Sequence, residues 1–258
     1  MTKPPGPRVA LGMRRLAFLS SAVLLTAGLL GALAGCMLLP AVTGSGTLIR
    51  TVHPASGFTG IQASHAFQVR VVPDSAYSVS VTCDDNLLPY LLVQNSGTSL
   101  RLGLIDGYAY LGVTLLAEVH MPAVAVIDAS EASSVRLDSG FSSPGRLTVV
   151  LSGASVCEAP GISCGDAAFD VSGASLASFT GTAAGLALVV SGASRVNLLD
   201  CPAGPARITV SGASEAWVDV GTQRVDLDAS GASTLYYGGT PALAVHSLSG
   251  GSRIVKVR

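Results

Sequence analysis

Hydrophobic and polar positions alternate with a period of two through the second half of the chain. Counted backwards from a recurring Ser-Gly-Ala-Ser tetrapeptide, the first, third and fifth positions are apolar in successive units: Leu151, Val149 and Leu147; Val171, Phe169 and Ala167; Val190, Leu188 and Leu186; Val210, Ile208 and Ala206. Polar residues such as Thr148, Asp170 and Thr209 stand between them. This alternation predicts a strand with one buried face before each tetrapeptide. A shorter alternating stretch after it, such as Val196 and Leu198, predicts a second strand.

The tetrapeptide itself recurs at a nearly constant interval. It occupies residues 152–155, 172–175, 191–194, 211–214 and 230–233, and variants of it occupy residues 130–133 and 249–252. The first serines are therefore 19 to 22 residues apart. A fixed period near 20 indicates one supersecondary unit per repeat, stacked on its neighbours. Because no stretch between the repeats has helical periodicity, we predict an all-β, single-chain parallel β-helix, a solenoid with coils of about 20 residues.

The tetrapeptides are predicted to form one corner of the coils. Glycine lets the backbone bend sharply there, and alanine is expected because a larger side chain would not fit. Each serine is expected to stack on the serine one coil away, so that the hydroxyls donate and accept along the column. The predicted corner column contains Ser152, Gly153, Ser172, Gly173, Ser191, Gly192, Ser211, Gly212, Ser230 and Gly231.

The region before the repeats is strand-like but lacks the regular period. Residues 77–81 alternate as a strand does. Residues 84–91 (Asp-Asp-Asn-Leu-Leu-Pro-Tyr-Leu) predict one or two helical turns with an acidic or Asn cap and a proline in the first turn. We therefore expect one domain, residues 48–258, in which a less regular N-terminal β region with one short helix (48–126) precedes regular coils (127–258).

The first 36 residues differ from the rest in charge and hydropathy. Arg14 and Arg15 precede an apolar run over residues 16–34, and Cys36 follows it closely. A basic start, an apolar stretch and small residues before a cleavage point are typical of a secretory signal peptide. The sequence Leu-Ala-Gly-Cys at its end resembles a bacterial lipobox, so we predict lipidation of Cys36. The alternative is an uncleaved membrane helix, because about 20 apolar residues span a bilayer.

Both alternatives place the rest of the chain outside the cytoplasm, where disulfides are chemically allowed. Residues 37–47 would then form a short tether. Cys157 and Cys164 enclose a turn-like stretch, which permits a local disulfide, and buried free thiols are the alternative. No pair of cysteines has CxxC spacing and no histidine lies near them in the sequence, so no metal site is predicted.

Composition and charge exclude two classes of protein. The whole chain has a net charge of −1. Its first 36 residues, here called the leader, hold four of the 15 basic residues and no acidic residue. The rest of the chain therefore has 11 basic and 16 acidic residues, a net charge of −5. A nucleic-acid binder that works by bulk attraction needs a basic face, so no nucleic-acid partner is predicted. With 49% hydrophobic residues, the chain is also too apolar to be disordered.

Few residues have the spacing that catalysis requires. Some β-helices are polysaccharide lyases or hydrolases, whose sites cluster carboxylates with a cation or a basic side chain. Asp226 and Asp228 share one outward face of a predicted strand, with Glu215 about one coil earlier, but a solvated polar face explains them equally well. The repeats contain no Gly-x-Ser-x-Gly elbow and no histidine at a fixed offset. We therefore predict no catalytic residues and no cofactor.

The aromatic residues of the C-terminal coils form the one candidate binding patch. Trp217 and Tyr236 are expected to offer a small apolar surface to a sugar or a partner protein. The other tyrosine of that pair, Tyr237, is expected to face the core.

Three elements together resemble the head GIN domain family: Ser-Gly-Phe-Thr-Gly-Ile at residues 56–61, the segment 84–91, and the Ser-Gly-Ala-Ser units. The resemblance covers residues 44–258. The family's repeat usually reads Ser-Gly-Ser-Gly-Asp, whereas this chain has Ala for the second Ser, Ser for the second Gly, and an acid only at Glu215. Members are described as autotransporter adhesin head domains, often on exported or lipid-anchored bacterial proteins. The resemblance implies a single-chain β-helix and no known reaction.

These observations predict a non-catalytic lipoprotein, displayed at the cell surface, that acts as an adhesion or binding module. Its partner would be a protein or glycan at that surface, and its membrane attachment would run through the lipid on Cys36. A structural or envelope-sensing lipoprotein without an external ligand is the alternative. A carbohydrate-active β-helix enzyme is a third possibility, which calcium-dependent loss of a polysaccharide would reveal.

Overall fold

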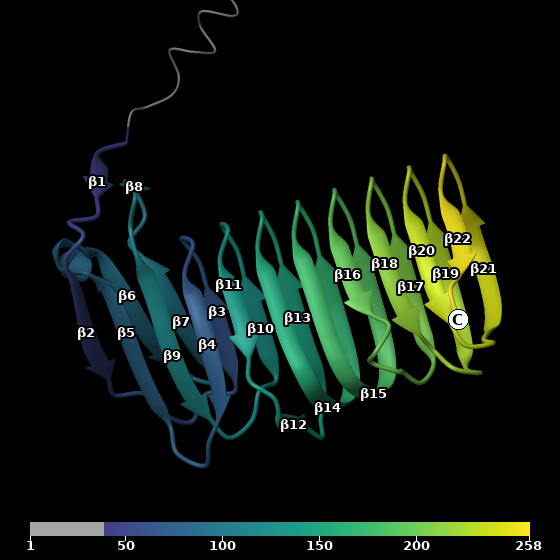
Figure 1. The fold of residues 1–258 in the computed structure, drawn as a ribbon, viewed down its shortest axis with the longest axis horizontal. Helices are drawn as coiled ribbons and strands as arrows, with labels where there is room; N and C mark the ends of the chain where they lie inside the picture. The colour runs from purple at the N-terminus through teal and green to yellow at the C-terminus, as the bar shows by residue number, and fades with distance from the viewer. Residues whose placement is uncertain (1–38) are drawn as a thin grey trace, which may run out of the picture. The chain divides into compact units, whose positions relative to one another are not determined.

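The computed structural model describes residues 39–258, which are almost entirely β-structure (Figure 1). The less regular part contains β1 (Ala41–Thr43), β2 (Leu48–His53), β3 (Gly60–Ala63), β4 (Gln68–Pro73), β5 (Ser78–Asp84), the 3₁₀ helix η1 (Asp85–Tyr90), β6 (Leu91–Ser96), β7 (Ser99–Leu104), β8 (Ala109–Leu111) and β9 (Leu115–Met121). In residues 39–258, no helix is long and apolar enough to cross a membrane. The predicted leader and Cys36 lie outside the described residues.

The regular part consists of shorter units that repeat. Its strands are β10 (Val126–Ala129), β11 (Ser134–Leu137), β12 (Ser142–Ser143), β13 (Leu147–Leu151), β14 (Val156–Val171), β15 (Leu176–Val190), β16 (Arg195–Leu198), β17 (Ala206–Val210), β18 (Glu215–Asp219), β19 (Arg224–Ala229), β20 (Thr234–Gly238), β21 (Ala242–Leu248) and β22 (Arg253–Lys256). The chain divides into two compact units. The larger unit, residues 42–106 and 110–258, forms the β-helix. The smaller unit consists of the segment that ends at Ala41 and of residues 107–109.

Two ladders of strands run the length of the β-helix, and Figure 1 shows the strands of successive coils side by side. Sheet A has the order β6, β7, β3, β10, β13, the ends of β14 and β15, β17, β19 and β21. Sheet B has the order β2, β5, β9, β4, β11, the starts of β14 and β15, β16, β18, β20 and β22. From β3 and β4 onward the pairing is parallel. The predicted parallel β-helix is confirmed.

Antiparallel strands close the N-terminal end of both sheets. The β6–β7 hairpin extends sheet A, and β5 and β2 extend sheet B beyond β9. A hairpin and its short connections need no regular period, which explains why the pattern is irregular before residue 126. The expected less regular β region with one short helix is present.

The core lies between the two sheets and is filled by alternate residues of the strands, except in the last coil, where β21 is almost entirely exposed. In sheet A the inward positions of successive coils align directly: Ile127, Val149, Phe169, Leu188, Ile208 and Leu227 occupy one row. All six side chains are buried. Phe169 also meets Phe179 of sheet B edge to face, with ring centroids 4.9 Å apart. The period-two pattern thus buries a continuous apolar column.

The tetrapeptides lie where the chain passes from sheet A to sheet B. Their glycines, Gly153, Gly173, Gly192, Gly212 and Gly231, all have φ between 72° and 75°. The alanine N–H of each coil donates to the glycine carbonyl of the preceding coil, as from Ala193 to Gly173 at 2.7 Å. Backbone hydrogen bonds therefore continue from coil to coil through the bend.

Two expected details of the corner are wrong. The second serine of each tetrapeptide is fully buried, and its hydroxyl bonds to backbone instead of to the next hydroxyl: Ser155 Oγ donates to the Ser152 carbonyl at 2.8 Å, and Ser233 Oγ to the Ser230 carbonyl at 2.8 Å. Between coils, a hydroxyl accepts from the serine N–H of the coil before it, as Ser175 Oγ does from Ser155 at 3.3 Å. Serine hydroxyls readily bond to nearby backbone groups in this way. The alanines are exposed, so packing does not limit their size.

The helix and the expected tether also differ from the prediction. η1 is a 3₁₀ helix, and the Asp84 side chain before it does not cap it. Instead Asp84, which is buried, accepts hydrogen bonds from the N–H groups of Gly46 and Thr114, both at 2.7 Å. The last part of residues 37–47 is therefore fastened to the β-helix. A buried carboxylate needs such donors, which the free backbone N–H groups of this segment supply.

Asp84 predicts a pH-dependent contribution to stability. Hydrogen bonds from Thr114 and Gly46 hold the pKa of Asp84 below its ordinary value of 3.8. Its ionised form therefore stabilises the fold above that value, and this contribution is lost as the pH falls through the lowered pKa. We expect Asp84→Asn to lower the unfolding free energy at pH 7 by about 1–3 kcal/mol, because two buried N–H groups lose a charged acceptor.

Urea unfolding of both proteins across pH 2–7 measures this effect, since the two curves should converge at low pH. The matched control is Asp85→Asn, because Asp85 is exposed and accepts only from the Ser45 hydroxyl among the hydrogen bonds described, at 2.6 Å. That control should change stability by less than about 0.5 kcal/mol. Equal effects of the two substitutions would refute the role of Asp84.

The disulfide considered between Cys157 and Cys164 does not form, because both thiols are free. The residues between them belong to β14 instead of a closed turn, and bend only at Gly161, where φ is 66°. Cys157 points into the core, and burial raises the pKa of its thiol. Cys157 and Cys164 are therefore free thiols, which pack as small apolar side chains do.

Candidate binding face

The outward face of sheet B carries two parallel rows of side chains. Residues at one register position of successive strands are Ser80, Glu118, Arg70, Arg136, Glu158, Ser178, Asn197, Trp217, Tyr236 and Val255, here called the central row. Two residues earlier along the parallel strands lies the second row, which contains Leu116, Gln68, Ser134, Val156, Leu176, Arg195, Glu215, Thr234 and Arg253. Parallel pairing in register therefore produces one long outer wall of mixed chemistry.

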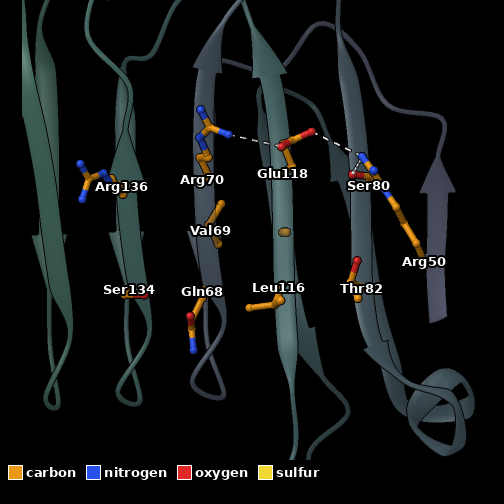
Figure 2. A pocket seen from close by; sticks show the side chains of 11 residues that line it. Arg50, Gln68, Val69, Arg70, Ser80, Thr82, Leu116, Glu118, Ser134 and Arg136 are labelled. Carbon is orange, nitrogen blue, oxygen red and sulfur yellow. Dashed lines mark hydrogen bonds and ion pairs between the residues drawn. The ribbon is translucent and has the colours of Figure 1, made fainter. Parts of the chain in front are cut away.

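The N-terminal part of this wall is hollowed by a groove of about 420 Å³, here called the arginine groove. Figure 2 shows three arginines around it, Arg50 from β2, Arg70 from β4 and Arg136 from β11. Glu118 of β9 is the one carboxylate among its lining residues, and the remaining polar lining includes Gln68, Ser80, Thr82 and Ser134. The lining is therefore positively charged, with hydroxyl and amide groups beside the guanidinium groups.

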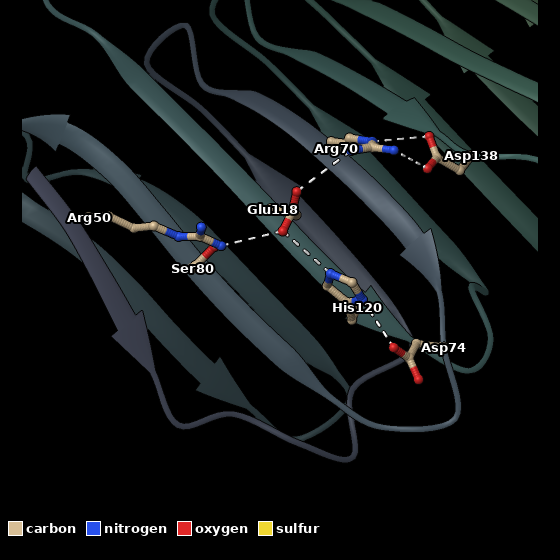
Figure 3. A network of polar contacts seen from close by, with 7 residues as sticks. All are labelled: Arg50, Arg70, Asp74, Ser80, Glu118, His120 and Asp138. Carbon is tan, nitrogen blue, oxygen red and sulfur yellow. Dashed lines mark hydrogen bonds and ion pairs between the residues drawn. The ribbon is translucent and has the colours of Figure 1, made fainter. Parts of the chain in front are cut away.

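Glu118 lies at the centre of a network of ion pairs (Figure 3). Its Oε1 is 3.4 Å from Arg50 Nη2, and its Oε2 is 3.7 Å from Arg70 Nη1. Arg50 also donates to Ser80 Oγ at 2.8 Å. These arginine side chains remain about 60% exposed, so each pair is worth little stability and leaves the guanidinium accessible.

The outer end of this network involves Asp138. Both oxygens of Asp138 accept from Arg70, at 2.7 and 3.3 Å, and this bidentate contact raises the pKa of the guanidinium. His120 bridges Glu118 and Asp74 at 3.5 and 3.2 Å. The network orients Arg70 across the groove mouth with its charge fixed.

A second groove, of about 500 Å³, lies farther along the same face and is here called the tryptophan groove. Trp217 stacks on Tyr236 of the next strand, with ring centroids 4.8 Å apart and planes 7° from parallel. On the other side of Trp217 the central row holds the shorter Asn197 and Ser178. Because one ring face is covered by Tyr236, the other face of Trp217 forms an end wall of the groove.

The structure thus brings together the two residues of the predicted patch. Tyr237, in contrast, packs against the core, as expected. Leu176 and Arg195 from the second row also line the tryptophan groove, and Leu176 is 44% exposed. An exposed aromatic face beside apolar and hydrogen-bonding groups is the usual composition of a sugar-binding or peptide-binding surface.

The carboxylates considered for catalysis do not converge. Asp226 faces outward from β19 in sheet A, whereas Glu215 lies on the outer wall of sheet B. Asp226 is bound by Arg224 at 2.7 Å and His246 at 3.2 Å, and the Arg224 hydrogen bond lowers its pKa. In residues 39–258, no group of three His, Cys, Asp or Glu side chains is placed to hold a metal ion.

Sequence reasoning missed the arginine groove and most of the central row. A signal was present, because Arg136, Glu158, Ser178, Asn197, Trp217 and Tyr236 each lie six residues after the first serine of their tetrapeptide. Arg70 and Glu118 precede the regular repeats, so no such count could place them. Their position depends on the pairing of β9, β4 and β11.

Solved structures share this fold at low sequence identity. A crystal structure of a "putative adhesin" from Bacteroides fragilis superimposes with a TM-score of 0.74 at 15% identity, covering 84% of this chain and 100% of its own. A "putative lipid binding protein" from Parabacteroides distasonis gives 0.68 at 18% identity with the same coverage. A "putative adhesin" from Parabacteroides merdae gives 0.64 at 13%, covering 85% of this chain and all of its own. Comparison with curated proteins finds no match.

The fold is a single-chain parallel β-helix whose outer wall carries two grooves. The sequence matches the family described as "Putative auto-transporter adhesin, head GIN domain" over residues 57–241. The chain belongs to this family, which confirms the resemblance.

Proposed function

We propose that this protein is an exported, lipid-anchored binding module that contacts an extended partner at the cell surface through the outer wall of sheet B. The observation that carries the proposal is the tryptophan groove, in which an aromatic face stands beside apolar and polar groups. Regular solenoid walls commonly bind elongated partners, because equivalent positions repeat along them. The family's adhesin description and the binding descriptions of the structural neighbours support the same class of function.

The arrangement of polar groups favours binding over catalysis. A catalytic site needs unlike groups that converge on one reacting atom. Here Glu215 pairs with Arg195 on sheet B at 2.8 Å, whereas Asp226 pairs with Arg224 on sheet A at 2.7 Å. Attachment to the membrane would run through Cys36, which keeps the β-helix outside the cytoplasm.

Removal of the Trp217 ring should abolish most of the binding. We expect Trp217→Ala to weaken binding to a glycan or surface protein identified on an array by about 30-fold, roughly the 2 kcal/mol that a central tryptophan contributes to an interface. Trp217→Phe should retain part of the affinity, because it keeps an aromatic face. Biolayer interferometry with the immobilised partner gives the dissociation constants.

The matched control is Val189→Ala, which removes an apolar side chain that is 43% exposed on sheet A. This control should leave the affinity unchanged. If Trp217→Ala and Val189→Ala bind like the wild type, the partner does not contact the tryptophan groove. If no array component binds the wild type, the proposed function is wrong.

A further inference from the structure

The arginine groove gathers three guanidinium groups in a chain that is acidic after its leader, with 11 basic and 16 acidic residues. Arg50 and Arg70 both approach the same carboxylate, Glu118. Asp138 pairs with Arg70 and Glu158 with Arg136, so the charges of the three arginines are balanced locally. The groove therefore offers exposed guanidinium groups without a general affinity for anions.

Two of the arginines are placed where strand pairing alone disfavours them. Arg70 of β4 and Arg136 of β11 occupy the same register position on adjacent parallel strands. Such strands lie about 4.8 Å apart, and like charges directly opposite each other destabilise a sheet. Carboxylates engage both from the sides, Asp138 at 2.7 Å from Arg70 and Glu158 at 3.3 Å from Arg136. The two arginine side chains remain 58% and 68% exposed, so each guanidinium group keeps N–H donors for a ligand anion.

The groups beside the arginines fit a polyhydroxylated ligand. Gln68 and Ser134 are neighbours on the second row, two residues before Arg70 and Arg136 on the same strands. On the other side of Gln68 the row continues through Leu116 to Thr82 of β5. Figure 2 shows these polar side chains below the three arginines in the view, on the same outward face. Hydroxyl and amide groups both donate and accept hydrogen bonds, as sugar hydroxyls require.

The arginine groove and Trp217 lie on the same row of the same sheet. The central row leads from Arg70 on β4 through β11, β14, β15 and β16 to Trp217 on β18. Five strand steps of about 4.8 Å give a separation of roughly 24 Å. One extended polymer that crosses the strands can therefore reach both places, whereas a small anion or a single lipid headgroup cannot.

We propose that the partner is an acidic polysaccharide, with its carboxylate or sulfate groups bound by the exposed guanidinium groups of Arg70 and Arg136 and a sugar ring stacked on Trp217. This inference rests on the proposed function and specifies its ligand. Charged hydrogen bonds would hold the polymer at one end of the wall, and stacking would hold it at the other. Both contacts can form together because the two places lie on one register row of sheet B.

The test uses full-length protein in neutral-lipid nanodiscs and three soluble probes: polygalacturonate, dextran sulfate and neutral dextran. Calorimetry should show binding of at least one acidic probe, weakened as NaCl rises from 0.1 to 1 M, because the screening length falls from about 10 Å to about 3 Å. Arg70→Gln and Arg136→Gln should each weaken that binding about tenfold, the effect of one lost charged hydrogen bond. Arg207→Gln is the matched control, since Arg207 is exposed on β17 in sheet A, and should have no effect.

Each other outcome overturns a stated part of the account. In one such outcome, neutral dextran binds as well as the acidic probes, and this binding is lost in Trp217→Ala but kept in Arg70→Gln and Arg136→Gln. That result would overturn the acidic ligand and leave the proposed function intact. Binding of anionic vesicles in preference to every polysaccharide overturns the polymer as partner. An affinity that Arg207→Gln lowers as much as Arg136→Gln means that net charge alone, not the groove, is responsible. Circular dichroism of each variant verifies that the β-structure is retained.

Discussion

Gly192→Ala should destabilise the protein by about 3–5 kcal/mol, at the upper end for a single substitution. Two costs combine at this position. Gly192 has φ of 73°, where an L side chain costs about 1–2 kcal/mol. A Cβ atom there would also lie 2.3 Å from the Gly173 carbonyl oxygen and 3.0 Å from its nitrogen. Because both are backbone atoms of the adjacent coil, the contact is relieved only by separating the coils.

Gly57→Ala isolates the first of these costs. Gly57 has nearly the same φ, 76°, and nothing lies within 4 Å of the Cβ position there. We expect this control to cost only about 1–2 kcal/mol. Urea unfolding followed by circular dichroism compares the two variants. Equal losses would show that the corner does not hold the coils in close contact.

Two natural corners have no glycine at the bend. One lies between β3 and β4, where His65 and Ala66 have φ of 60° and 59°. The other is the variant tetrapeptide at residues 130–133, where both Glu131 and Ala132 have positive φ, 54° and 63°. The corner there uses two left-handed residues, whereas the later corners use one glycine. The later repeats therefore keep glycine because their bend follows a different backbone path in tight contact with the coil before it.

Substitution of Cys36 should have an all-or-none effect on lipidation. If the Leu-Ala-Gly-Cys sequence is a lipobox, the thiol accepts the diacylglycerol and becomes the new N-terminus, which anchors the chain stably through two acyl chains. Cys36→Ala should then incorporate no labelled palmitate and should retain residues 1–35. Intact-mass spectrometry of the membrane fraction detects both changes.

Cys164→Ala is the control, because Cys164 is a partly buried free thiol of β14. This variant should be labelled like the wild type. A wild-type protein that keeps residues 1–35 and carries no lipid would contradict the proposal. The apolar run would then be a membrane helix.

The alternation of apolar and polar residues and the repeat period near 20 residues were sufficient to predict the β-helix. Leu186, Leu188 and Val190 could be assigned to the core because the side-chain period of a strand is two. The corner followed from the glycine of the tetrapeptide. The hydrogen bonds of its serines did not, because the Ser233 hydroxyl donates to the Ser230 carbonyl through backbone positions that no pattern reveals.

The binding face was only partly predictable for the same reason. Trp217 and Tyr236 are 19 residues apart, one coil, so their stacking is encoded in the repeat. Arg70 and Glu118 come from segments of different length in the irregular region, whereas Arg136 belongs to the first regular coil. Only the observed register, with β4 between β9 and β11, places these three charges side by side.

The fluorescence of Trp217 tests the central claim most directly, because this residue is the single tryptophan of the chain. Titration with the polysaccharide that binds best should produce a saturable change in its emission, with the same dissociation constant that calorimetry gives. A sugar ring stacked on the open face of Trp217 displaces water from the indole and changes its environment. Binding that saturates in calorimetry while the tryptophan emission stays constant would contradict the account.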